Sequence, residues 1–492
     1  MKSLPRFLAL WVGFHLLLLS LLPVPALGAG ASELLKKSKA QPAPTQPEGP
    51  VTPAFAPYLD LGPLLGHVSA SNALVWVKAS GAARLSVRLG QKRDLSDGAE
   101  INGPRLAADT DFMGQVLLPE LNSSRPYYYC VLLDGKPAML PPYPSFATAP
   151  PDLSPSHVRV AFVSCVGYNG YDSAATWADL AARTNFDLLL MLGDNVYANS
   201  TDPAVLGQYF AVQRHLPGYA DIARRIPQYA IWDNHDYGPE PTDRTAKHKD
   251  QALRLFKNLW PNPSYGEADN PGVYHHFTRG GVDFLMLDNR YHRSPDNSPD
   301  DGTKSMLGEK QLAWFKVQLL ASKAPVKVLA IGCEWESDGL KNSWSNFKRE
   351  REDVLKFIED NKISGVLMVS GDRHFTAAYQ VIGKFIEVTS GPMGSVNSTS
   401  KPTPEMFYYS GKGKFYCIFD LNTRDARPKV TLEVYKASEG LVERHAFTWD
   451  EVLGVTKIQP LRATDGASGR VGSASARSHP PSSGPGARAT SR

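Results

Sequence analysis

Short apolar runs that each end in a cluster of polar side chains constrain this chain more than any other feature of its sequence. Each run is rich in aliphatic residues and predicts a buried strand. In open α/β sheets, ligands bind outside the carboxyl ends of such strands. The thiol, carboxylates, amides, imidazoles and phenol at these ends therefore predict a metal site at one sheet edge. The clusters are Ser164-Cys165, Gly193-Asp194-Asn195-Val196-Tyr197, Trp232-Asp233-Asn234-His235-Asp236 and Ser370-Gly371-Asp372-Arg373-His374.

The order of these clusters resembles the motif series of the PhoD-like branch of the metallophosphatases, whose relatives include the purple acid phosphatases. Leu287-Asp288-Asn289-Arg290 fits the same series. The similarity runs from about Pro57 to His445 and includes Leu307–Trp314 and Lys327–Gly332, which lie outside the predicted site. The resemblance implies a phosphoesterase that hydrolyses phosphate monoesters, diesters or both by direct attack of a metal-bound hydroxide.

The resemblance also implies a binuclear or larger metal centre of Fe(3+) with Ca(2+), and Zn(2+) or Mn(2+) are the alternatives. Asp194 would bridge two ions, because a carboxylate has two oxygens. Cys165 and Tyr197 would bind iron as thiolate and phenolate, and His374 would lie on the same side. Asn234 and Asp372 would bind the second ion, since oxygen ligands suit calcium. The implied ligands are Cys165, Asp194, Tyr197, Asn234, Asp372 and His374.

Two further residues are candidates for the chemistry. His235 has the carboxylates of Asp233 and Asp236 nearby to orient or charge it, and would contact the phosphoryl group or protonate the leaving group. Arg290 follows another strand, where its guanidinium would clamp phosphate oxygens. The alternatives are a structural role for His235 and a plain ion pair of Arg290 with Asp288.

The N-terminus predicts a signal peptide over residues 1–28. Lys2 and Arg6 precede an apolar run from Phe7 to Leu22, and small residues follow before Gly28. The run is shorter than the roughly 20 residues that span a bilayer, and an uncleaved anchor is the alternative. We expect a secreted or periplasmic protein without stable membrane insertion. No twin-arginine pair is present, so a general secretory signal would mean that metals are loaded after export.

The chain of 492 residues exceeds the size of a single core, about 250 to 300 residues, so two domains with tails are expected. An Ala- and Pro-rich linker covers residues 29–53. Short alternating strands over 57–149 predict a small β-sandwich of the Fn3-like kind. Strands and helices alternate over 157–445, where the resemblance implies a four-layer α/β/β/α catalytic domain. Residues 464–492 predict a disordered tail. The helical stretches are Ser173–Arg183, Gly308–Ser322 and Asn346–Asn361.

Charge gives no support to a nucleic-acid partner. The formal net charge is +4, and the C-terminal stretch is itself basic, so the folded body is near neutral. The expected partner is a phosphate ester, and a diester fits this expectation. The second candidate function is a non-catalytic secreted binding protein that keeps the fold. It is disfavoured because no metal position carries an apolar residue.

The cysteines leave two interpretations of Cys165 open, a free thiolate and a disulfide. A disulfide between Cys165 and Cys333 is geometrically conceivable in an exported chain, and it would remove the thiolate. For Cys130 and Cys417, buried free thiols are the simplest expectation.

Several positions differ from the family pattern. Asn234 and Asp236 stand where the family often has Asp and Glu, and residues 342–347 resemble a family segment without its acids. The second site is therefore expected to carry less charge and to bind calcium more weakly.

Overall fold

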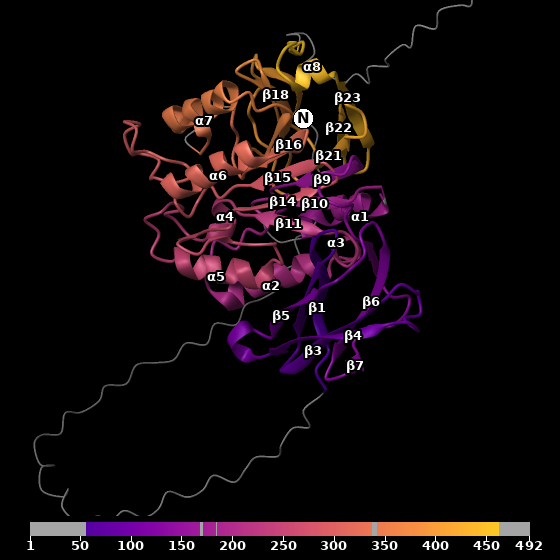
Figure 1. The fold of residues 1–492 in the computed structure, drawn as a ribbon. Coiled ribbons are helices and arrows are strands. Elements are labelled where there is room, and N and C mark those ends of the chain that lie inside the picture. Colours follow the sequence, from indigo (N-terminus) through magenta and orange to yellow (C-terminus); the bar gives the residue numbers. More distant parts are fainter. Residues whose placement is uncertain (1–55, 168–170, 184, 337–341, 462–492) are drawn as a thin grey trace, which may run out of the picture. The chain divides into compact units, whose positions relative to one another are not determined.

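The apolar runs form strands of two mixed sheets in the computed structural model, which describes residues 56–167, 171–183, 185–336 and 342–461 (Figure 1). The six-stranded sheet has the order β11 (Gln228–Ile231), β10 (Leu188–Leu192), β9 (His157–Val163), β21 (Phe415–Asn422), β22 (Lys429–Lys436), β23 (Gly440–Phe447). The seven-stranded sheet has the order β14 (His275–Arg279), β15 (Val282–Met286), β16 (Val326–Ala330), β17 (Val366–Ser370), β19 (Phe385–Thr389), β18 (Thr376–Val381), β20 (Met406–Ser410). Strands β9 to β11 are mutually parallel, as are β15, β16, β17 and β19.

Alternation along the strands of the second sheet builds two separate cores. Successive side chains point to opposite faces of a sheet. Strand β15 sends Phe284 and Met286 into the hydrophobic cluster that both sheets share, and Leu285 into a cluster on the other face. Helices α6 (Glu309–Ala321) and α7 (Lys348–Asp360) cover that other face. Both helices lie where the sequence predicts them, and the mixed sheets with helices confirm the expected α/β class.

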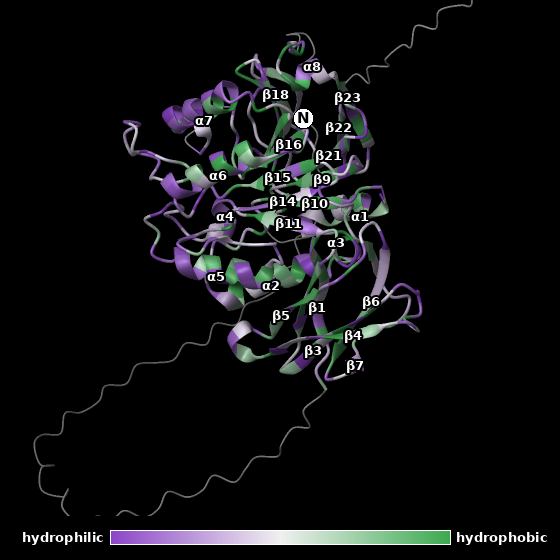
Figure 2. Ribbon diagram, viewed as in Figure 1, coloured by the Kyte–Doolittle hydropathy of each residue, from purple (hydrophilic) through white to green (hydrophobic). Residues whose placement is uncertain are grey.

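Further helices contribute to the shared cluster. They are α1 (Ala174–Ala182), α2 (Pro203–His215), α3 (Pro217–Ala223) and α5 (Lys249–Leu259). Two further helices, α4 (Asn234–Tyr237) and α8 (Trp449–Val452), are about one turn long. Helix α2 begins after Asp202, whose side chain accepts a hydrogen bond from the Ala204 N–H at 2.8 Å. Figure 2 shows that α5 and α7 each have a hydrophobic and a hydrophilic side, the pattern of helices that cover a core.

The N-terminal strands form two antiparallel sheets that share a second hydrophobic cluster. One contains β1 (Leu59–Val68), β2 (Ala73–Ala79) and β5 (Met113–Leu118), and the other contains β4 (Ala99–Leu106), β3 (Ala83–Gly90), β6 (Pro126–Leu133), β7 (Lys136–Pro137) and β8 (Ser145–Ala147). A small hairpin pairs β12 (Gly266–Glu267) with β13 (Asn270–Pro271). The Trp76 indole N–H donates to the Asn258 carbonyl at 2.6 Å, which ties β2 to the end of α5. The Fn3-like assignment of this region stays a prediction.

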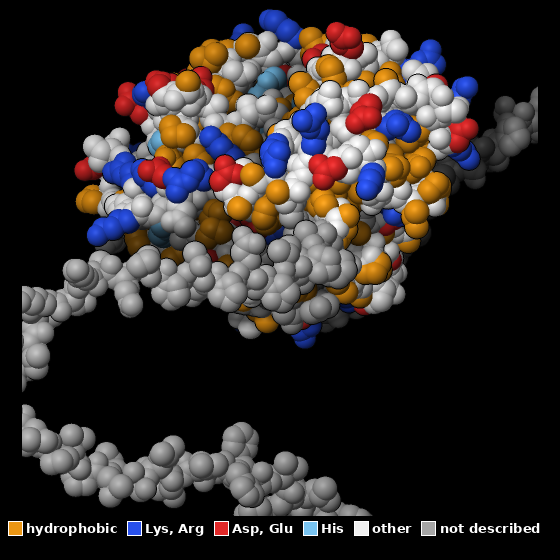
Figure 3. All heavy atoms as spheres, turned by 90° about the horizontal axis from the view of Figure 1, so that it is seen from below, with side chains coloured by type: hydrophobic (Ala, Val, Ile, Leu, Met, Phe, Trp, Pro, Cys, Tyr) orange, Lys and Arg blue, Asp and Glu red, His pale blue; other side chains and the backbone are white. Residues whose placement is uncertain are grey.

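The signal peptide, linker and tail that the sequence predicts over residues 1–28, 29–53 and 464–492 lie outside the described residues. Within the described part of the chain, no helix combines the length and the apolar character needed to cross a bilayer. On the face drawn in Figure 3, basic and acidic side chains are interspersed, in line with the near-neutral composition.

Candidate metal centre

The carboxyl ends of parallel strands from both sheets carry the predicted site residues. Cys165 follows β9, Asp194 follows β10, and Asp372 follows β17. Asn234 opens helix α4 directly after β11. The two sheets thus bring residues that are far apart in the sequence to one place, as the pattern of strand ends predicts.

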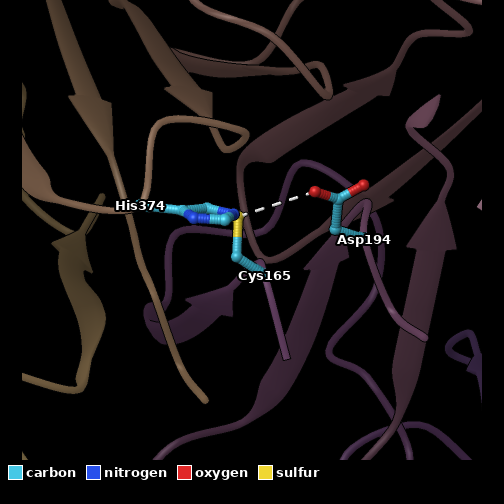
Figure 4. A group of neighbouring side chains, drawn as sticks. All are labelled: Cys165, Asp194 and His374. Carbon is cyan, nitrogen blue, oxygen red and sulfur yellow. Dashed lines mark hydrogen bonds between the residues drawn. The ribbon is translucent and has the colours of Figure 1, made fainter. Parts of the chain in front are cut away.

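One group of donors surrounds a single oxygen of Asp194. Donor atoms of Cys165, Asp194 and His374 all lie within 4.8 Å of one another. Figure 4 shows the His374 ring beside the Cys165 sulfur, which is 3.8 Å from Asp194 Oδ2. The Tyr197 hydroxyl donates to Asp194 Oδ2 at 3.1 Å and lies 2.9 Å from His374 Nε2. These four side chains therefore form one thiol, phenol, imidazole and carboxylate cluster.

A second group contains carboxylates alone. Oxygens of Asp194, Asp233 and Asp372 also lie within 4.8 Å of one another. Asp233 Oδ2 and Asn234 Oδ1 are buried and have no hydrogen-bond partner among the described residues. Unpartnered buried oxygens are rare in folded proteins, and a cation would satisfy them. Asp194 belongs to both groups, which is the arrangement that a bridging carboxylate needs.

The donor types fit the implied metals. A thiol and a phenol beside a histidine suit a transition metal, whereas oxygen donors alone suit a hard cation. The fit thus rests on the clustered donors and on the two unpartnered oxygens.

Burial without a cation disfavours the ionised forms of these ligands. Burial, and then the Asp194 charge, raises the pKa of the Cys165 thiol and of the Tyr197 phenol far above their usual values. Burial, and then Asp233, also raises the pKa of Asp194, and the same causes raise that of Asp372 to about 6. A bound cation acts in the opposite sense, because it favours deprotonated ligands.

Four predicted ligands have left-handed backbone conformations. The φ angles are 54° at Cys165, 52° at Asp194, 68° at Asp372 and 57° at His374. Residues other than glycine rarely adopt such angles, and each costs on the order of 1–3 kcal/mol. Backbone strain of this kind gathers at functional sites, where the surrounding structure enforces it.

A buried ion pair fixes the turn that carries Asp372 and His374. Arg373 lies between them, and its Nε is 3.2 Å from Glu334 Oε2. The Tyr379 hydroxyl donates to the other oxygen of Glu334 at 2.6 Å. This anchoring holds the side chains on either side of Arg373 toward the site.

Asp236 joins two of the site loops instead of orienting His235. Its carboxylate accepts hydrogen bonds from the backbone N–H of Asn195 at 3.0 Å and of Asp233 at 3.1 Å. The predicted role of Asp236 beside the imidazole is therefore wrong, because its oxygens accept from backbone amides and from the side-chain amide of Asn195.

The side chain placed against His235 is an amide. His235 Nδ1 lies 2.6 Å from Asn199 Oδ1, so Nδ1 carries the proton and the lone pair of the neutral ring is on Nε2. The ring lies 4.0 Å from that of Tyr197, centroid to centroid. Burial is the main cause that lowers the pKa of His235 to about 4.

Arg290 pairs with Asp233. Its Nε donates to Asp233 Oδ1 at 2.6 Å, and its Nη2 donates to Asn342 Oδ1 at 2.8 Å. The contact of Arg290 with the Asp288 carboxylate is made by its backbone N–H, at 2.9 Å, and not by its guanidinium. The alternative of a side-chain ion pair with Asp288 is therefore wrong, and Arg290 as a phosphate clamp stays a prediction.

All four cysteines are free and buried. The disulfide between Cys165 and Cys333 is absent, which leaves the thiol of Cys165 available as a ligand. The thiols of Cys130 and Cys417 are free as expected.

Two residues at the site, Asn199 and Asn342, have no assigned role in the sequence pattern, and Asp233, expected to orient or charge His235, pairs with Arg290. Asp233 and Asn199 lie within or beside the recognised motifs, but their partners come from other loops. Asn342 donates to Asp372 Oδ1 at 2.8 Å, from the segment that lacks the family's acids. That departure from the family pattern is the sequence feature that could have pointed to Asn342.

Two facing mixed sheets with polar clusters at the strand ends are the architecture of the metallophosphatases. The chain belongs to the PhoD-like phosphatase family, which residues 160–410 match, just over half of its length. Residues 56–151 match a separate domain of unknown function, DUF7800.

Named relatives agree with this membership. Alkaline phosphatase D of Bacillus subtilis (strain 168) is 24% identical over 355 residues, covering 61% of this chain and 58% of that protein. The chain thus matches less than two thirds of that relative's length. The solved structure of PhoD superposes with a TM-score of 0.65 at 16% identity, over 84% of this chain and 95% of the other. Purple acid phosphatase PPD1 from yellow lupin (Lupinus luteus) gives a TM-score of 0.61 at 14% identity, over 84% and 78%. At these identities the superpositions show a shared fold.

Proposed function

We propose that the chain is a metal-dependent phosphoesterase that hydrolyses phosphate monoesters, diesters or both by direct attack of hydroxide on phosphorus. The observation that carries the proposal is the position of Asp194 in both donor groups. Metal ions in such a pair of sites supply a hydroxide nucleophile and neutralise phosphoryl charge.

The side chains divide into two sets of ligands. Cys165 and Tyr197, with the nearby histidine, would hold the first ion, for which we propose iron. Asn234 and Asp372 would hold the second, for which we propose calcium, and Asp233 is available to join them. Asp194 would bridge the two ions, and His374 is the histidine beside the first one.

His235 is proposed to handle a proton beside these ligands. Asn199 fixes its tautomer, so Nε2 is the atom that accepts or, once protonated, donates. A half-buried neutral imidazole would accept a hydrogen bond from substrate first. It would protonate a leaving oxygen only after gaining a proton.

Export and domain organisation complete the proposal. The basic residues and apolar run at the N-terminus support secretion or periplasmic location after removal of residues 1–28. Residues 57–149 are proposed as a β-sandwich domain separate from a catalytic domain over 157–445. The hydrogen bond between Trp76 and the end of α5 supports a role for the β-sandwich in holding α5 in place. Helix α5 follows the loop after His235, so this contact also supports one side of the site.

Metal analysis of the purified protein, alongside hydrolysis of p-nitrophenyl phosphate and its bis ester, tests the proposal. We expect about one iron per chain, a visible charge-transfer band that weakens in Tyr197→Phe, and turnover of at least one ester. Metal-loaded protein that hydrolyses neither ester would favour the non-catalytic binding protein instead. A protein that contains zinc and no iron would contradict the assignment of iron to Cys165 and Tyr197.

A further inference from the structure

We propose that Arg290 is a permanent counter-cation of the carboxylate half of the site. It balances buried negative charge when no metal is bound, and it engages one oxygen of Asp233 so that the other stays available to a cation. This inference rests on the metal centre proposed above.

The site concentrates carboxyl groups where water is scarce. Oxygens of Asp194, Asp233 and Asp372 lie within 4.8 Å of one another. Asp194 is 1% exposed and Asp233 is fully buried. Buried carboxylates without compensation are strongly unfavourable, so a metal-free chain needs a positive charge of its own here.

Arg290 supplies that charge. It is 2% exposed, and both Nε and Nη2 contact Asp233 Oδ1. Among the described residues, no other Lys or Arg forms a salt bridge with the three carboxylates, and Arg373 pairs with Glu334. Burial would lower the pKa of Arg290, but the nearby acidic groups, Asp233 first among them, together outweigh it and the net shift is upward.

The remaining guanidinium donors also face protein groups. Nη2 donates to Asn342 Oδ1 at 2.8 Å, and Nη1 to Thr242 Oγ1 at 3.4 Å. Asn342 in turn donates to Asp372 Oδ1 at 2.8 Å, so one chain of contacts links Arg290 to two of the acids. Asn289 Nδ2 donates to Asp233 Oδ1 at 2.8 Å as well. These side-chain donors all contact Oδ1 of Asp233, and Oδ2 has no hydrogen-bond partner among the described residues.

A counter-cation and a phosphate clamp differ in what their removal does. Loss of a counter-cation harms the metal-free protein most, because bound metal replaces the missing positive charge. Loss of a clamp leaves the metal-free protein unharmed and weakens phosphate binding.

The test compares the thermal midpoints of Arg290→Met and the natural protein, each stripped by chelation and then saturated with Mn²⁺. We expect the metal-free variant to melt about 5 °C or more below the natural protein, since breaking a buried pair leaves an uncompensated charge. Saturating Mn²⁺ should close at least half of that gap. Inorganic phosphate should bind the loaded variant within about threefold of the natural affinity. Arg293→Met, a buried arginine of the same loop, is the matched control, and its loss should not depend on Mn²⁺.

Two results would overturn the inference. An equal gap with and without Mn²⁺ would leave Arg290 purely structural, and an unchanged metal-free midpoint with tenfold weaker phosphate binding would make it a clamp. If Arg290→Met does not fold, the double variant Asp233→Asn, Arg290→Met should recover metal-free stability, and no recovery would also overturn it. A natural protein whose midpoint ignores Mn²⁺ would instead count against the metal centre itself.

Discussion

At the scale of single residues, Asp194 is the side chain on which both halves of the site depend. Because its oxygens belong to both donor groups, Asp194→Ala should lose both metals and nearly all activity. Asn234→Ala should lose mainly the second metal. Elemental analysis of the purified variants checks this, and an Asp194→Ala protein that keeps both ions would exclude a bridge.

His235 separates chemistry from metal binding. His235→Ala should keep its metals, leave KM little changed and lower kcat by about 10² to 10⁴, the usual span for general acid–base catalysis. The loss should be smaller for p-nitrophenolate, a leaving group that hardly needs a proton. Equal losses for good and poor leaving groups would leave electrostatic stabilisation alone.

Asn199→Ala is the matched control for His235→Ala, because it removes the partner of Nδ1 and leaves the ring. We expect a smaller loss of kcat than in His235→Ala, with metals retained. Full activity in both variants would assign His235 to a structural role.

At the scale of elements, continuous apolar runs and regular helical spacing were sufficient to predict β9, β10, β17, α1, α6 and α7. Helix α2 was not predicted, because its buried side includes Gln213 and Arg214. Their partners are the carbonyls of Asn195 and Leu259, in segments that the periodicity of α2 does not reveal. A polar residue on a buried helix face interrupts the apolar stripe unless its distant partner is known.

The same reasoning explains what was and was not predictable at the site. Ligands that directly follow a strand could be inferred from motif order, as for Cys165 and Asp194. The pairing of Arg290 with Asp233 and Asn342 could not, because three separate loops supply those atoms. Side-chain contacts between loops depend on how the sheets face each other, and a linear motif does not encode that.

The turn after β10 offers a prediction at this scale. Gly193 has a φ of 98°, and a Cβ there would lie 2.7 Å from the Asp233 Cβ. Gly193→Ala should therefore reduce the free energy of unfolding by about 1–3 kcal/mol or more, through backbone strain and displacement of Asp233. Denaturant unfolding and metal content measure the two effects. Gly81→Ala is the control, because no heavy atom lies within 4 Å of its added Cβ. Equal stability of the two variants would contradict the argument.

At the scale of the whole described chain, a buried aromatic stack joins the N-terminal strands to both central sheets. The rings of Tyr229, from β11, and Phe277, from β14, stack at 3.7 Å between centroids. His67, from β1, packs edge-on against both rings, and His275 extends the stack. Burial is the main cause that lowers the pKa of His67 to about 4 and that of His275 to about 3. The folded protein therefore holds two neutral imidazoles where its three groups of strands meet.

These imidazoles predict loss of stability in mild acid. Between the unfolded pKa of about 6.5 and the lowered folded values, the unfolded chain binds protons that the folded chain does not, so stability falls as pH falls through this window. His275→Phe keeps an aromatic ring in the stack and removes one titrating group. The melting temperature of His275→Phe relative to that of the natural protein should be constant above about pH 7 and should rise steadily from pH 6.5 to pH 5, by the equivalent of about 1–2 kcal/mol. Comparing the two proteins at each pH cancels the titration of the site carboxylates, which both retain. A difference that stays the same from pH 7 to pH 5 would mean that His275 takes up its proton in the folded chain as readily as in the unfolded one, and that the stack does not make the fold sensitive to acid.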